Sequence, residues 1–390
     1  MNTAPIKVLH LSPWVKTTGG VETLLARHAR ADAALGFESW QHALFDRTPP
    51  RAGEAYSTEA FGWKDTPRSM RARLAASLQR HAGSVLVWQN AWGVPWFADV
   101  DHSARRIICL QDSVTHFGPL LPGLAARADG LTCLSRAAAE DIRRGLPGWP
   151  EERLVVLPLP LSLPARLAAA RPPRDAWVIG CAGRLVKAQK RWDRLVPFVE
   201  ELRRLGVNYR IEVVSDGPLR PWLQRRLGDD ARVAFLGWQE RGAYWARLQT
   251  WDFGVSFTAH DGGPIVLLEM MAAGAIPLYP QIGGSLGDDY AGEVDPRCHY
   301  PAGDPRAAAR ALQALTTESP AALQALRERA MRLVAPHADD AYERVFAEFV
   351  RRIAAAPRFS RAPRGDRPPQ WFDRLPLGLL TRVFPHTLRG

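Results

Sequence analysis

The stretch from Phe253 to Tyr279 changes its hydrophobic pattern several times over a short distance. An apolar, β-prone start gives way to the polar text HDGG, a helix-like run begins at Pro264, Gly274 ends that run, and the text IPLY resumes as a strand. A strand, a helix and a second strand joined by such a short return are typical of a βαβ unit with parallel strands. The pattern therefore predicts an α/β chain with parallel sheets.

The start of this helix is suited to an anion. Pro264 fits the first helical turn, and Gly262 and Gly263 in front of it let a ligand approach the N–H groups around Ile265 and Val266. A phosphate group is one such ligand.

Glu269 is the polar exception in the apolar run of the same helix. An unpaired buried carboxylate costs several kcal/mol, so Glu269 requires a partner. Two interpretations stay open: Glu269 binds a ligand hydroxyl, or it lies at a helix edge that reaches water while Asp261 simply caps the helix.

Asp261 and Glu269 stand eight residues apart around the Gly-Gly-Pro helix start, and an Ala-rich end, Gly274 and Ile276-Pro277 follow. This text resembles the E-x7-E signature of the retaining family 4 glycosyltransferases, which have the GT-B fold. The chain departs from that signature in two places. It has Asp261 where the family mostly has Glu, and Gly263 where the family has an aromatic residue.

A second glycine pair, Gly19-Gly20, lies between a strand-like run from Lys7 to Ser12 and a helix-like run. Backbone N–H groups in such a loop are able to face a phosphate. The loop also resembles the family's first loop, since Val21 and Glu22 follow the glycines. A flexible turn is the alternative interpretation.

Arg184 and Lys190 lie in the text GRLVKAQKR, directly after a strand-like run from Trp177 to Ala182. This text resembles the family's G-R-L-x-x-x-K-G segment, with Arg191 in place of the last glycine. The resemblance implies that the two cations hold the donor diphosphate and neutralise it as it leaves. A solvated basic helix start is the alternative.

Two further turns resemble donor-binding turns of the family. The text SDGP, which contains Gly217, is close to the family's G-x-G-P turn, with Ser215 for the first glycine. The strand-like text VAFLG ends at Gly237, and the resemblance makes Gly237 and Trp238 candidates for contact with the nucleotide base.

On the acceptor side, the strand-like text RIICL leads into Gln111-Asp112. The family often has His-Asp at this place, with the histidine near the reacting sugar, so Gln111 puts a histidine-based role in doubt. His116 is a weaker candidate to substitute for it.

Three tryptophans, Trp88, Trp92 and Trp96, are either core residues, which we favour, or an acceptor-binding wall. The pair Asp99 and Asp101 has the D-x-D pattern of a metal site, but we expect no metal, because GT-B enzymes need none.

The remaining text sets the organisation of the chain. We expect loop over residues 46–65, a basic helix from Ser69 to His81, and a stiff proline-rich linker near residues 165–175. The predicted domains are an acceptor-binding Rossmann-like domain over 1–168, a nucleotide-sugar-binding Rossmann-like domain over 176–336, and C-terminal helices over 337–390 that cross back to the first domain.

The segment 357–390 is basic, and Phe372, Leu375, Leu379 and Val383 recur in it at helical spacing. A basic amphipathic helix lies on an anionic membrane or docks on its own protein, and both alternatives stay open.

Composition narrows the function classes. The chain has 390 residues, 51 basic and 40 acidic side chains and a formal charge of +11, which indicates an anionic partner. No nucleic-acid-binding motif is visible, so we expect nucleotide phosphates or a membrane instead.

Four dispersed cysteines predict free buried thiols. The absence of a signal peptide or an apolar span predicts a cytoplasmic protein, with a peripheral position on the inner face of the plasma membrane left open.

Together these features predict a GT-B enzyme with two Rossmann-like domains facing across a cleft. The resemblance implies retaining sugar transfer from a nucleotide-sugar donor to a glycan or lipid-linked acceptor, for cell-surface polysaccharide or lipopolysaccharide synthesis, without metal or cofactor. The alternatives are another GT-B activity, such as a phosphorylase or epimerase, and a non-catalytic protein that binds anionic membrane or nucleic acid.

Asp261, Arg184 and Lys190 are the candidate catalytic residues. The expected donor site comprises Gly19, Gly20, Arg184, Lys190, Gly217, Gly237, Trp238, Asp261, Gly263, Pro264, Ile265, Val266 and Glu269, and the expected acceptor side comprises Gln111, Asp112 and His116.

Overall fold

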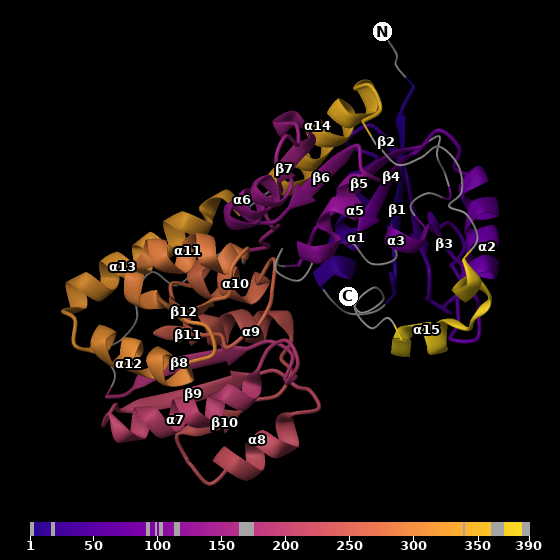
Figure 1. The fold of residues 1–390 in the computed structure, drawn as a ribbon. Helices are drawn as coiled ribbons and strands as arrows, with labels where there is room; N and C mark the ends of the chain where they lie inside the picture. Colours follow the sequence, from indigo (N-terminus) through magenta and orange to yellow (C-terminus); the bar gives the residue numbers. More distant parts are fainter. Residues whose placement is uncertain are drawn as a thin grey trace.

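The computed structural model describes residues 4–16, 20–90, 94–97, 100, 104–112, 118–163, 175–337, 340–359 and 370–383. Over these residues the chain forms two α/β lobes, each built around its own sheet (Figure 1). We call residues 4–163 together with 340–383 the N-lobe, and residues 175–337 the C-lobe. The linker expected near 165–175 lies almost entirely outside the described residues.

The N-lobe sheet is wholly parallel and has the order β3-β2-β1-β4-β5-β6-β7. Every residue of β4 and of β6 is buried, as in parallel strands that are covered on both faces. They are β1 (Ile6–Ser12), β2 (Phe37–Ala43), β3 (Tyr56–Thr58), β4 (Val85–Gln89), β5 (Arg105–Cys109), β6 (Gly130–Cys133) and β7 (Leu154–Val156).

The C-lobe sheet is also parallel and has the order β10-β9-β8-β11-β12-β13. Gly180 lies under a buried tryptophan, because a methyl group there would come within 1.8 Å of the Trp251 ring. The strands are β8 (Trp177–Ala182), β9 (Tyr209–Val214), β10 (Val233–Phe235), β11 (Phe253–Val255), β12 (Ile276–Gln281) and β13 (His299–Pro301).

Both sheets reverse their strand order at one place, between β1 and β4 in the N-lobe and between β8 and β11 in the C-lobe. In open α/β sheets, ligands bind outside the carboxyl ends of the strands at such a topological switch point. The fold therefore offers one ligand-binding edge on each lobe. The predicted pair of α/β domains with parallel sheets is confirmed.

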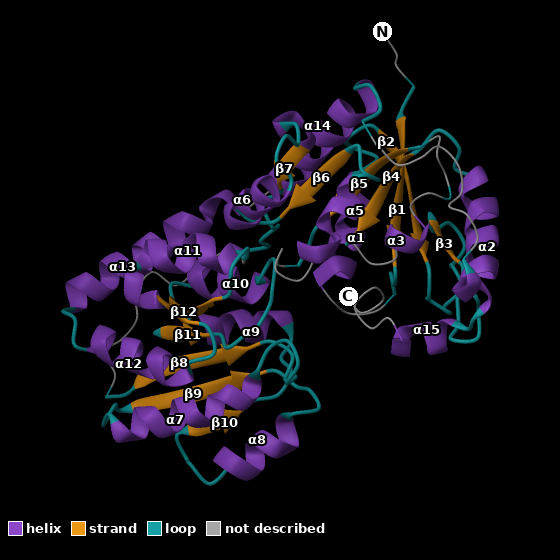
Figure 2. Cartoon of the chain, in the orientation of Figure 1, coloured by secondary structure: helices purple, strands orange, loops and turns teal. Residues whose placement is uncertain are grey.

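Helices flank both sheets (Figure 2). In the N-lobe, α1 and α14 cover one face of the sheet, while α2 and α6 pack with the opposite face. The N-lobe helices are α1 (Gly20–Ala31), α2 (Pro67–Gln79), α3 (Val94–Phe97), α5 (Leu121–Ala125), α6 (Arg136–Gly145), α14 (Ala341–Ala355) and α15 (Leu377–Val383). Those of the C-lobe are α7 (Leu195–Arg204), α8 (Arg220–Leu227), α9 (Arg241–Leu248), α10 (Ile265–Ala272), α11 (Leu286–Val294), α12 (Pro305–Thr316) and α13 (Pro320–Val334).

The C-terminal segment packs on the N-lobe. Leu377 and Leu380 of α15 are buried in the same apolar cluster as α2. The Leu377 N–H donates to the Asp65 carbonyl over 2.8 Å, and the Gly378 N–H donates to the Trp63 carbonyl over 2.9 Å. Over residues 370–383, docking on the protein is thus the alternative that the structure shows.

Two local predictions were wrong in detail. Residues 46–65 were expected to be loop, but they contain β3, a strand too short for its pattern to show a period. The basic helix begins at Pro67 rather than Ser69, because the Thr66 and Ser69 side chains cap it reciprocally.

All four cysteines are free and buried, as predicted. Within the described ranges, no helix combines the length and apolarity that crossing a bilayer requires.

Candidate functional site

The loops that follow the strands of the C-lobe meet at one edge of its sheet, because the carboxyl ends of parallel strands share an edge. Arg184 and Lys190 lie in the loop after β8, Gly217 in the turn after β9, and Asp261 in the loop after β11. Most of the residues predicted for the donor site therefore come from one edge.

Lys190 and Asp261 form an ion pair between Nζ and Oδ2. Asp261 is 8% exposed, so the ammonium group neutralises a nearly buried carboxylate. The two loops are also joined through their backbones, since the Ala259 N–H donates to the Gln189 carbonyl over 2.8 Å. A cation and a carboxylate that the sequence analysis placed in separate roles are thus one unit.

Arg184 is exposed, and its side chain makes no hydrogen bond or ion pair with another described residue. The loop that carries Arg184 packs against the SDGP turn, residues 215–218. A methyl group at Gly217 would lie 2.7 Å from the Leu185 carbonyl oxygen, and Gly217 has a φ of 154°. The Leu185 N–H donates to the Asp216 carbonyl over 2.9 Å. The guanidinium is therefore a cation on a fixed loop, without a partner in the described part of the chain.

Trp238 stands at the same edge, after β10, and is 69% exposed. Gly237 before it has a φ of 71°, and a methyl group there would approach Arg220 Nη1 to 3.3 Å. An exposed indole is suited to stacking on a flat ring.

Glu269 is buried in α10, where a tyrosine hydroxyl is its partner. The Tyr244 hydroxyl of α9 donates to Glu269 Oε2 over 2.8 Å. Burial raises the pKa of Glu269, and this hydrogen bond acts against that rise. The second oxygen, Oε1, has no partner among the described residues.

The His260–Gly262 loop presses directly against the N-lobe. A methyl group at Gly262 would lie 2.6 Å from the Gln111 carbonyl oxygen and 2.7 Å from Asp112 backbone atoms. His260 Nδ1 lies 3.3 Å from an Asp112 carboxylate oxygen. Gln111 and Asp112, which were predicted for the acceptor side, therefore face the residues predicted to hold the donor.

Gly263 explains one departure from the family signature. A methyl group there would lie 2.4 Å from Leu159 Cδ1 and 2.7 Å from Leu134 Cδ1, both in the N-lobe. An aromatic side chain at this position would collide with the N-lobe as it is packed here.

A second contact between the lobes was missed from the sequence. The Asp289 carboxylate of α11 accepts hydrogen bonds from the Arg136 and Ala137 N–H groups over 2.6 and 2.8 Å, so it caps the start of α6. The Ser135 hydroxyl donates to the Gly284 carbonyl over 3.3 Å beside it. Burial raises the pKa of Asp289, an effect that the two N–H groups counter.

The contact between His260 and Asp112 predicts a pH dependence. The hydrogen bond to Asp112 raises the pKa of His260 above its ordinary 6.5. A raised pKa means that the contact stabilises fully below the ordinary value and is lost as the pH rises through the folded-state value. The stability difference between wild type and His260→Gln, measured by thermal unfolding, should therefore shrink as the pH rises through and above 6.5. A difference that stays constant or grows would contradict the assignment.

Several predicted residues fall elsewhere. Gly20 begins α1 and is exposed, whereas Gly19 and His116 lie outside the described residues. Asp99, Asp101 and Trp92 lie outside them as well. Trp88 and Trp96 are buried, so the favoured interpretation of these two as core residues is confirmed.

The loop after β1 is held by Asp46, for which no local sequence pattern predicts this role. Asp46 accepts hydrogen bonds from the Val15 and Lys16 N–H groups over 2.6 and 2.8 Å. The Tyr56 hydroxyl donates to the same carboxylate oxygen over 3.2 Å. The carboxylate therefore fixes the chain just before the Gly19-Gly20 loop.

Among the described residues, one buried group has the side chains of a metal site: His10, His28 and Asp32. Each of the four ring nitrogens already lies within hydrogen-bond distance of a protein partner. Hydrogen bonding accounts for this group.

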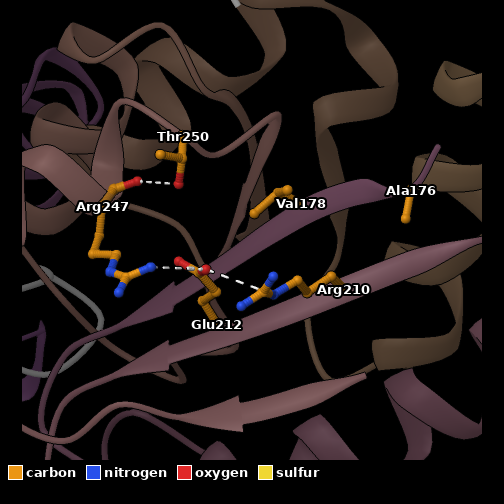
Figure 3. A pocket seen from close by; sticks show the side chains of 6 residues that line it. All are labelled: Ala176, Val178, Arg210, Glu212, Arg247 and Thr250. Atoms are coloured by element: carbon orange, nitrogen blue, oxygen red, sulfur yellow. Dashed lines mark hydrogen bonds and ion pairs between the residues drawn. The ribbon is translucent and has the colours of Figure 1, made fainter. Parts of the chain in front are cut away.

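A cavity of about 350 Å³ lies on the C-lobe sheet away from these loops, and Figure 3 shows the six residues that line it. Glu212 lies between two arginines, 3.4 Å from Arg247 and 3.8 Å from Arg210. Its other oxygen accepts a hydrogen bond from Trp251 Nε1 over 3.1 Å. None of the predicted site residues lines this cavity. Its one carboxylate, Glu212, is already satisfied by the two arginines and the tryptophan.

The C-lobe, which carries these loops, is similar to a known protein family. Residues 176–318 match the family model described as Glycosyl transferases group 1. No curated protein sequence matches the chain.

Solved structures resemble the chain over most of its length. The lipopolysaccharide outer core galactosyltransferase WaaB, in its apo form, has a TM-score of 0.69 at 18% identity, over 88% of this chain and 99% of its own. The pneumococcal O-GlcNAc transferase GtfA in complex with UDP and GlcNAc has a TM-score of 0.69 at 10% identity, over 91% and 100%. A mutant of TarM from S. aureus has a TM-score of 0.59 at 13% identity, over 74% of this chain but only 59% of TarM.

The chain therefore has the GT-B fold. Its C-lobe carries a group 1 glycosyl transferase domain.

Proposed function

We propose that this chain is a retaining glycosyltransferase of the family 4 type, which moves a sugar from a nucleotide-sugar donor to a glycan or lipid-linked acceptor in cell-surface polysaccharide or lipopolysaccharide synthesis. The observation that carries the proposal is the joined Lys190–Asp261 pair at the carboxyl edge of a lobe that matches the glycosyl transferase model. The likeness to WaaB, and to GtfA with UDP and GlcNAc, supports the same reaction class.

The leaving diphosphate gathers negative charge as the sugar departs. Preorganised donors aimed at developing charge are usually the largest contribution to catalysis. Three groups supply such donors: the exposed guanidinium of Arg184, the ammonium group of Lys190, and the N–H groups of Ile265 and Val266, which precede the first intrahelical hydrogen bond of α10. These groups balance the diphosphate in place of a metal ion.

Lys190 has a second role in this arrangement. Asp261 accepts hydrogen bonds from hydroxyls of the transferred sugar and positions the anomeric carbon, but its carboxylate would repel a diphosphate close by. The ion pair with Lys190 offsets that repulsion, so one ammonium group serves the carboxylate and the phosphate together. For retention, the leaving phosphate itself takes the proton of the acceptor hydroxyl.

Glu269 accepts hydrogen bonds from the donor ribose through Oε1, while Tyr244 holds Oε2. Trp238 stacks on the nucleotide base. The exposed side chains of Trp371 and Leu379 on the docked tail, and of Trp63 beside it, suit a peripheral contact with an anionic membrane that carries the lipid-linked acceptor.

Glu269→Ala should weaken nucleoside diphosphate binding about tenfold to a hundredfold, since a hydrogen bond to a charged group is worth about 1.5–3 kcal/mol. Calorimetric titration with a panel of nucleoside diphosphates measures this and identifies the nucleotide at the same time. Glu240→Ala is the matched control, because Glu240 is an exposed carboxylate just before α9. Equal affinities in wild type and Glu269→Ala would remove Glu269 from the donor site. Release of a nucleoside diphosphate only when acceptor is present separates transfer from phosphorylase or epimerase activity.

A further inference from the structure

A chain of hydrogen-bonded side chains crosses the interior of the N-lobe from α14 to the end of β5. All of its members except Gln111 are nearly inaccessible to solvent. In order they are Tyr342, His28, Asp32, His10, Gln89 and Gln111, with successive atom pairs 3.0, 3.0, 3.0, 3.0 and 2.7 Å apart.

The strand register explains why polar side chains meet there. His10 of β1 is paired with Val87 of β4, and Gln89 of β4 is paired with Cys109 of β5. Because side chains two residues apart share a face of a sheet, His10, Gln89 and Gln111 all lie on the face that α1 and α14 cover. They stand at the carboxyl end of the sheet, beside the switch point between β1 and β4.

The direction of each hydrogen bond follows from Asp32. Burial opposes ionisation of Asp32, but the hydrogen bonds with His10 and His28 outweigh it and hold its pKa well below the ordinary range. An ionised carboxylate only accepts, so His10 Nε2 and His28 Nδ1 both carry protons. On the other side of its ring, His28 Nε2 lies 3.0 Å from the Tyr342 hydroxyl.

The tautomer of His10 sets the orientation of both glutamine amides. Burial lowers the pKa of His10 to about 4, so this ring is neutral at pH 7, and with its proton on Nε2 its Nδ1 accepts. The Gln89 amide must therefore donate to Nδ1, which turns its carbonyl oxygen toward Gln111. Gln111 donates its own N–H to that oxygen over 2.7 Å. Its carbonyl oxygen, Oε1, is left over.

Oε1 of Gln111 is buried and has no hydrogen-bond partner in the described part of the chain. A buried acceptor without a donor costs free energy, which a ligand hydroxyl would recover on binding. The Gln111 backbone lies against Gly262, next to the Lys190–Asp261 pair. The unpaired oxygen is thus at the border of the two lobes.

We propose that Gln89 is a positioning residue, which fixes the Gln111 amide so that Gln111 presents a hydrogen-bond acceptor to a sugar hydroxyl. The proposal rests on the proposed function. The charge of Asp32 fixes the direction of the hydrogen bonds that lead from it to Gln111. The Gln111 amide therefore cannot rotate to present a donor without breaking several buried hydrogen bonds. The site therefore favours a ligand group that donates, such as a hydroxyl, over one that only accepts.

The polarity of the chain is tested without any substrate. Nitrogen-15 NMR of histidine-labelled, full-length protein at pH 7, with His10→Gln and His28→Gln used for assignment, reports which ring nitrogen is protonated. We expect His10 neutral with the proton on Nε2, and His28 with the proton on Nδ1. A proton on His10 Nδ1 would reverse Gln89 and overturn the proposal.

The role toward substrate is tested with Gln89→Met, Gln111→Met and the double variant. Calorimetry compares UDP with UDP-glucose, or the pair that the nucleotide panel selects, and kinetics separates KM for the acceptor from kcat. We expect each single variant to weaken sugar recognition about tenfold, the effect of one lost hydrogen bond. If UDP-glucose no longer binds more tightly than UDP, the bound hydroxyl belongs to the sugar of the nucleotide-sugar donor. An acceptor hydroxyl is identified if the acceptor KM rises while kcat holds.

Non-additivity distinguishes positioning from general stabilisation. If Gln89 acts through Gln111, the double variant should be no worse than Gln111→Met. Gln41→Met is the matched control. Gln41 is a buried glutamine of the same sheet, and it donates to the Leu25 carbonyl, which is not part of the hydrogen-bonded series from Tyr342 to Gln111. Its loss should lower stability without changing sugar recognition.

Additive losses, or unchanged recognition in Gln111→Met, would overturn the positioning role. If the wild type binds no nucleotide sugar, the proposed function and the hydroxyl contact both fail, while the NMR result still decides the amide polarity.

Discussion

Replacing Lys190 with alanine should reduce sugar transfer by about a hundredfold or more, the loss typical when a group that stabilises transition-state charge is removed. The structure gives two reasons for so large an effect. The ammonium group that would bind the leaving diphosphate is lost, and Asp261, only 8% exposed, is left as an unpaired carboxylate beside it. Both changes leave negative charge uncompensated where the reaction itself develops it.

The measurement is kcat/KM for transfer together with nucleoside diphosphate affinity. Lys187→Ala is the control, because Lys187 is an exposed lysine in the same loop. That variant should behave like wild type. If Lys190→Ala kept its activity while both lobes stayed folded, the carboxyl edge of the C-lobe would not be the donor site.

The sequence was informative where chemistry is encoded locally. The Gly-Gly-Pro helix start, the odd carboxylate of Glu269 and the glycine that ends α10 all lie within one continuous stretch, and the structure folds that stretch as expected. Periodicity also indicated β8 with its observed ends, Trp177 and Ala182. Short-range rules were sufficient for these elements.

The partners of those residues were beyond reach, because long-range contacts leave no local pattern. Lys190 and Asp261 are 71 positions apart in the chain, and Glu269 and Tyr244 are 25 apart. The sequence showed that Glu269 needs a partner, but it did not show which one. The cap that Asp289 provides for α6 spans 153 positions and has no local signature.

The buried polar chain is an intermediate case. His10 lies inside the apolar text KVLHLS, and His28 shares the apolar side of α1 with Leu24 and Leu25. Polar residues at core positions indicate a buried network, since each must be hydrogen-bonded there. The pattern shows that such a network exists, whereas its direction toward Gln111 follows only from the strand register.

Gly262→Ala should also lower transfer by about a hundredfold, but by a different route. The added methyl group would meet the Gln111 carbonyl oxygen at 2.6 Å and Asp112 backbone atoms at 2.7 Å. These atoms belong to the backbone and cannot rotate aside, so the loop that carries His260 and Asp261 must move away from the N-lobe. A misplacement of about 1 Å at a reacting centre is enough to cost about a hundredfold in rate.

The two variants are distinguished by what they leave intact. In Gly262→Ala, the Lys190–Asp261 pair and the Tyr244–Glu269 pair remain within the C-lobe, so nucleoside diphosphate affinity should fall far less than transfer. Small-angle scattering should report a shifted arrangement of the lobes. Gly242→Ala is the control, because a methyl group there meets nothing within 4 Å and lies in α9. If Gly262→Ala lost nucleotide affinity and transfer equally, donor binding rather than the junction with Gln111 would be the function of this glycine.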